Sequence, residues 1–62
     1  MSPEVETYIR TNVKARADHR LQAVEVLYHA GIMGIGGRAD LRRSVMDMAA
    51  DELATEGLEV RE

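Results

Sequence analysis

The fold is decided by one short stretch, Gly31-Ile32-Met33-Gly34-Ile35-Gly36-Gly37, which holds all but one of the chain's 5 glycines. Glycine is the poorest helix former after proline, so this stretch predicts a break between two helices. The segments on either side are rich in good helix formers. We therefore expect an all-α fold: a long helix, a Gly-rich hairpin and a shorter helix packed antiparallel.

The segment before the glycines predicts one long helix over about residues 3–30. Ser2 is a suitable N-cap, Pro3 fits the first helical position, and Gly31 is a suitable stop. The apolar residues form two stripes, one through Val13 and one through Leu21, that are rotated relative to each other. The helix is either continuous or bent near residues 16–20, and we expect continuity because the segment has no breaker residue.

The segment after the glycines predicts a second helix over about residues 40–56, with Asp40 as its N-cap and Gly57 as its C-terminal cap. Residues 57–62 then form a short tail, in which Leu58 is placed to contact Leu53. One face of this helix carries the apolar residues Leu41, Val45, Met48 and Ala49, with Leu53 at its edge.

Glu52 lies on the apolar face of this second helix, where an unpaired charge is costly. In an antiparallel hairpin folded about the glycines, equal rise places Glu52 beside residue 18. The sequence therefore predicts an ion pair between Glu52 and Arg16 or Arg20. The same register places Met48 near Leu21 and Val45 near Val24 or Leu27.

The size of the chain predicts one domain over residues 1–62 with a thin core. The chain has no cysteine, phenylalanine or tryptophan. A domain this small buries only about 60% of its unfolded surface. We therefore expect a homodimer, forming a four-helix bundle, or a monomer that completes its core on another protein. The candidate interface residues are Val5, Tyr8, Ile9, Val13 and Met46.

The charges are unevenly distributed, although the net charge is only −3. Arginines cluster at the start of the second helix and acids at its end, which is the reverse of what the helix dipole favours. Such charges suggest an external partner, either an antiparallel second copy or a phosphate or acidic group. No apolar run is long enough for a membrane span, and the N-terminus does not resemble a signal peptide, so we expect a cytoplasmic protein.

The segment Gly34-Ile35-Gly36-Gly37-Arg38 resembles the hairpin of the helix-hairpin-helix family of nucleic-acid-binding modules. The resemblance covers about ten residues, and Asp40 stands where the family usually has alanine. It implies sequence-independent phosphate binding by backbone amides and nearby arginines. The alternative is a simple connector whose apolar residues plug the end of the hairpin. The candidate phosphate or partner contacts are Gly34, Gly36, Gly37, Arg38, Arg42 and Arg43.

The sequence contains no motif that indicates catalysis, and we expect no catalytic residue, cofactor or metal. Glu25 and His29 are four residues apart on one helix face, but two ligands do not complete a metal site. We therefore expect a small, non-enzymatic protein-interaction or regulatory module, with nucleic-acid binding as the alternative. A third possibility is a helical subunit of a larger enzyme that folds on binding.

Overall fold

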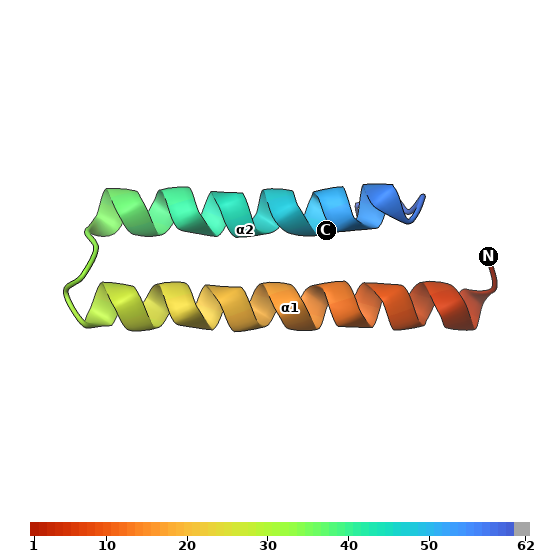
Figure 1. Cartoon of the computed structure of the whole chain (residues 1–62), viewed down its shortest axis with the longest axis horizontal. Coiled ribbons are helices and arrows are strands. Elements are labelled where there is room, and N and C mark those ends of the chain that lie inside the picture. The colour runs from red at the N-terminus through yellow and green to blue at the C-terminus, as the bar shows by residue number, and fades with distance from the viewer. Residues whose placement is uncertain (61–62) are drawn as a thin grey trace.

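The computed structural model of the protein, described for residues 1–60, is an antiparallel helical hairpin (Figure 1). Helix α1 spans Pro3–His29 and helix α2 spans Ile35–Thr55. The two helices pack side by side in a rod of 44 × 16 × 14 Å. The structure confirms the all-α class and the two-helix hairpin, and residues 1–60 form no strand.

Helix α1 begins with the cap expected from the sequence. The backbone N–H of Val5 donates a hydrogen bond of 3.2 Å to the hydroxyl of Ser2, and Pro3 occupies the first turn. The helix then runs through residues 16–20 without interruption (Figure 1). The expected continuity of the long helix is therefore confirmed.

Gly31 ends α1 in a left-handed conformation, with φ of 76°. The N–H of Ile32 donates to the carbonyl of Leu27 at 3.0 Å, and the N–H of Gly31 donates to the carbonyl of Tyr28 at 3.1 Å. These two bonds are the Schellman motif, which satisfies carbonyls that the last helical turn would otherwise leave unpaired. Glycine suits this position because a side chain is strained at that φ.

Gly57 ends α2 in the same way, with φ of 74°. The N–H of Leu58 donates to the carbonyl of Leu53 at 2.8 Å, which closes a second Schellman motif. The expected glycine cap is confirmed. The tail then continues to Val60, and the remainder of the expected 57–62 tail lies outside the described residues.

Helix α2 begins earlier than expected, at Ile35, so the predicted cap at Asp40 is wrong. Gly34 is the N-cap, and Gly36 and Gly37 lie in the first helical turn rather than in an open hairpin. The first turn is closed by Arg38, whose N–H donates to the carbonyl of Gly34 at 3.0 Å. Cross-helix contacts of the Arg38 side chain, described below, offset the low helix propensity of the glycines.

The core of the hairpin is thin. Among residues 1–60, the buried apolar side chains are Val13, Ala17 and Val24 from α1 and Val45 and Leu53 from α2. The predicted core positions Leu41 and Met48 are instead 40% and 41% exposed. The buried face of α2 runs from Val45 to Leu53, and at 100° per residue Met48 points away from that line. Val45 and Leu53, therefore, are the residues by which α2 packs on α1.

Candidate interaction surface

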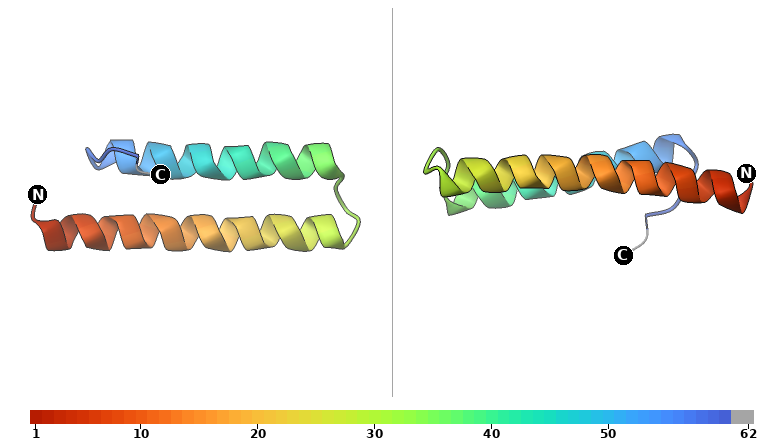
Figure 2. Two further views of the ribbon diagram at one scale, coloured as in Figure 1. Left: turned by 180° about the vertical axis from the view of Figure 1, so that it is seen from behind. Right: turned by 90° about the horizontal axis from the view of Figure 1, so that it is seen from below.

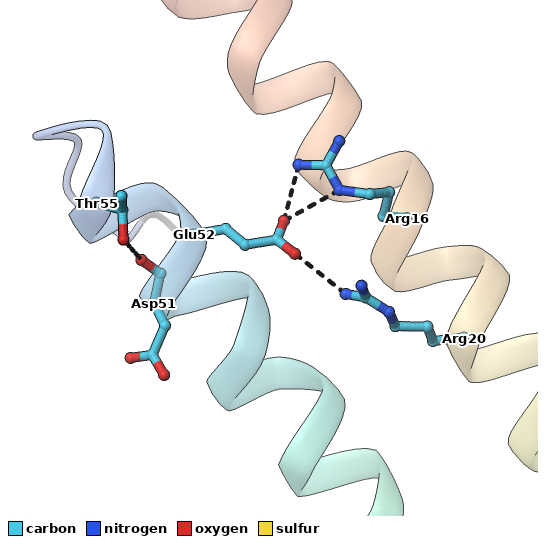
Figure 3. Close-up of polar contacts among 5 residues, drawn as sticks. All are labelled: Arg16, Arg20, Asp51, Glu52 and Thr55. Atoms are coloured by element: carbon cyan, nitrogen blue, oxygen red, sulfur yellow. Dashed lines mark hydrogen bonds and ion pairs between the residues drawn. The ribbon is translucent and has the colours of Figure 1, made fainter.

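Two arginines of α1 hold Glu52 of α2 across the helix pair, as Figure 3 shows. Arg16 donates to Glu52 Oε2 from Nε at 3.2 Å and from Nη2 at 2.9 Å. Arg20 Nη1 donates to the other oxygen, Oε1, at 3.2 Å. The predicted ion pair is confirmed with both arginines. It neutralises the charge on the apolar face and fixes the lengthwise register of the hairpin.

A second ion cluster, centred on Glu25, joins the helices near the connection between them. Glu25 Oε1 accepts hydrogen bonds from Arg38 Nε and from Arg42 Nη1, each at 2.9 Å. The Arg38 guanidinium also lies 4.8 Å from the ring centroid of Tyr28, a cation–π distance. His29 Nε2 lies 3.6 Å from the remaining oxygen, Glu25 Oε2. This cluster anchors the first turns of α2 onto the end of α1.

Both glutamates are more acidic than usual because of their arginines. Hydrogen bonds from Arg38, and secondarily from Arg42, lower the pKa of Glu25 below its ordinary value of 4.5. Hydrogen bonds from Arg16 and Arg20 lower the pKa of Glu52 in the same way. Both carboxylates are thus charged at neutral pH, and both clusters persist there.

An apolar groove runs along one edge of the hairpin, between the two helices. Leu21 contributes to it from α1, and Met46, Ala50 and Leu53 contribute from α2. Met46 is 57% exposed, so this apolar surface is open to solvent. The charged residues Lys14 and Asp18 also line the groove. This edge lies opposite the groove lined by Ile9, Arg16 and Glu52.

The tail covers one end of the apolar groove. In the right-hand view of Figure 2 it leaves the end of α2 on one side of the hairpin. Arg10 Nη1 donates to the carbonyl of Glu59 at 2.8 Å, which ties the tail to α1. Val60 then lines the groove beside Leu53. The groove therefore stays open towards the start of α2, around Met46.

The candidate phosphate contacts are only partly available. Gly34, Gly36 and Gly37 are exposed at the start of α2. Arg38 and Arg42 are instead both held by Glu25, whose single negative charge offsets part of their two positive charges. Arg43 is exposed and makes no ion pair with any residue in 1–60. Sequence reasoning missed the role of Glu25, whose partners lie 13 and 17 residues away along the chain.

The candidate interface residues do not form one surface. Val13 is only 4% exposed and belongs to the core, so it is unavailable to a partner. Val5 and Tyr8 are exposed near the start of α1, and Ile9 lines the groove on the Glu52 edge. Met46 lies on the other edge. Sequence reasoning also missed Leu21 and Ala50 as neighbours of Met46, because their proximity depends on how α2 is rotated against α1.

Comparisons with known protein families, with curated proteins and with solved structures find no match to this chain. Within residues 1–60, no group of three or more histidine, cysteine, aspartate or glutamate side chains is arranged to hold a metal ion. Neither helix in that part of the chain is long and apolar enough to span a membrane. The function must therefore be inferred from the surface of the hairpin itself.

Proposed function

We propose that the chain is a small, non-enzymatic protein-interaction or regulatory module that acts through a helical homodimer in the cytoplasm. The observation that carries this proposal is the open apolar groove between the helices, lined by Leu21, Met46 and Leu53. A two-helix hairpin with so few buried side chains has little hydrophobic stabilisation of its own. Covering the groove with a second hairpin forms a four-helix bundle, the usual way in which such hairpins complete a core.

The thermal stability of the protein tests this proposal. A dimer whose monomer is less stable melts at a temperature that rises with protein concentration. We expect that rise for the wild-type chain. Met46→Glu places a charge in the apolar groove and is expected to abolish the concentration dependence. Val26→Glu, on an exposed site of α1, is the matched control and should retain it. A melting temperature independent of concentration in the wild type contradicts the proposal.

A second candidate function is phosphate binding at the start of α2. Gly34 provides no side-chain cap and the first turn holds no acidic residue, which leaves the amides there open to an anion. The engagement of Arg38 and Arg42 by Glu25 weighs against this function. If it operates, binding to a DNA oligonucleotide falls steeply with salt and is lost when Arg38, Arg42 and Arg43 are all changed to Glu. Binding that survives these changes excludes this site.

A further inference from the structure

We infer that the tail of each chain acts as a strap, which competes with a second copy for one end of the apolar groove. The strap consists of residues 58–60, which follow the C-terminal cap of α2 (Figure 2). The inference rests on the proposed function, because it states what limits dimerisation through that groove. Val60 of the strap already lines the groove together with Lys14 and Leu53. A second copy that covers the whole groove therefore has to displace Val60.

The end of the groove that the strap covers has an apolar floor. Val13 and Ala17 contribute to this floor from α1, and Leu53 contributes from α2. All three are buried while the strap is in place. Because apolar attraction is not directional, the floor accepts an aliphatic side chain whether it comes from the strap or from another chain. The strap and a second copy therefore compete for the same surface.

The strap is held loosely. Val60 is 57% exposed, so it gains only part of the stabilisation that full burial of a valine gives. Arg10 Nη1 donates a hydrogen bond of 2.8 Å to the carbonyl of Glu59, at an exposed site where water is an alternative partner. Arg10 Nε is buried and has no hydrogen-bond partner within residues 1–60, so the closed strap leaves this guanidinium incompletely paired. A second copy thus has little to overcome in displacing the strap.

Gly57 separates the strap from the helix, so the strap can leave the groove without unwinding α2. The N–H of Leu58 donates to the carbonyl of Leu53 at 2.8 Å, and this bond fixes the chain as far as Leu58. Glu59 and Val60 follow it and belong to no helix or strand. Their departure from the groove therefore leaves the cap of α2 in place.

The open part of the groove gives a second copy its first contact. Leu21 and Met46 line this part, towards the connection between the helices. Only those chains whose strap is displaced offer the whole groove to a partner. The apparent dissociation constant of the dimer rises in proportion as that fraction of chains falls. The strap therefore sets the concentration at which the chain dimerises.

Two substitutions at Val60 test the strap in opposite directions. Val60→Asn removes the aliphatic contact with the groove, so more chains have a displaced strap, and dimerisation should tighten by about three- to ten-fold. Val60→Leu enlarges that contact at a site with room for it, since Val60 is 57% exposed, and dimerisation should weaken by about two- to five-fold. Sedimentation equilibrium of the intact chain measures the dissociation constants.

Val26→Asn and Val26→Leu are the matched controls. Val26 is the same residue type, is 66% exposed on α1 and does not line this groove. Neither control should change the dissociation constant by more than about two-fold. Both Val60 variants should keep the helicity of the wild type by circular dichroism, because Val60 lies outside both helices. A tail that only stabilises the hairpin makes the opposite prediction for Val60→Asn, which is a less stable monomer and a weaker dimer.

The outcomes separate the strap from the dimer. A tighter dimer in Val60→Asn together with a weaker dimer in Val60→Leu supports the strap. Any other result with a dimeric wild type, including a weaker dimer in Val60→Asn, overturns the strap and leaves the proposed homodimer intact. A wild-type chain that stays monomeric at all concentrations overturns both.

Discussion

Arg16 Nη2 lies 2.9 Å from Glu52 Oε2, and this contact joins residues that are 36 positions apart in the chain. Together with the bond from Arg20 it places one carboxylate between two guanidinium groups on the facing helix (Figure 3). Glu25 is held in the same manner nearer the connection between the helices. Two ion clusters, together with the apolar core, therefore fix the lengthwise register of the two helices.

The pH dependence of stability follows from the two glutamates. Because the pKa of each is lower in the folded chain than the ordinary value of 4.5, each stabilises the fold above that value. This stabilisation is lost as the pH falls below 4.5 and through the lowered pKa values. We expect the melting temperature to drop as the pH falls from neutral to below 4.5 and on through the lowered pKa values. Circular dichroism melts across this range measure the effect.

Glu52→Gln isolates one of these clusters. The variant should melt at a lower temperature than the wild type at neutral pH and should show a smaller loss on acidification. Glu56→Gln is the control, because Glu56 makes no ion pair with residues 1–60. An equal acid response in wild type and Glu52→Gln would show that the cluster does not contribute to stability.

Val24→Ala tests the thin core. Val24 is 5% exposed, and its truncation should reduce the free energy of unfolding by about 1–3 kcal/mol through lost burial and a residual cavity. Val26→Ala, at a site that is 66% exposed, should change it by no more than about 0.5 kcal/mol. Urea unfolding at a fixed protein concentration measures both. Equal effects would mean that Val24 is not a core residue.

Alanine substitutions at two glycines of the connecting stretch should change the stability of the fold in opposite directions. Gly31→Ala should destabilise the fold by about 1–2 kcal/mol, because alanine is strained at φ of 76°. Gly36→Ala should stabilise it by about 0.5–1 kcal/mol, because Gly36 is helical and an added Cβ meets no atom within 4 Å. A destabilised Gly36→Ala variant would argue that α2 begins later than Ile35.

The sequence predicts the pairing of Glu52 with Arg16 and Arg20 because few arrangements of the two helices give that carboxylate a cation. Glu52 on an apolar face needs a nearby cation, and the hairpin geometry brings Arg16 and Arg20 to it. The glycine caps at Gly31 and Gly57 are equally local, since they depend on backbone conformation alone. These features follow from helix periodicity and chain length.

The start of α2 and its rotation are harder to predict. Glycine propensity argues against a helix at Gly36 and Gly37, but the contacts of Arg38 with Glu25 and Tyr28 support one. Those contacts come from the facing helix and carry no local signal. The apolar residues of α2 nearly surround the helix, so periodicity alone does not decide between Met48 and Leu53 for the core.

Sedimentation equilibrium of the wild-type chain tests the central claim, that the hairpin functions as a homodimer. We predict a mass approaching twice the 6.9 kDa of one chain as concentration rises, with full helicity by circular dichroism in the dimeric range. A folded species of 6.9 kDa at every concentration would contradict the claim, because a stable monomer would not need a second copy to cover its groove.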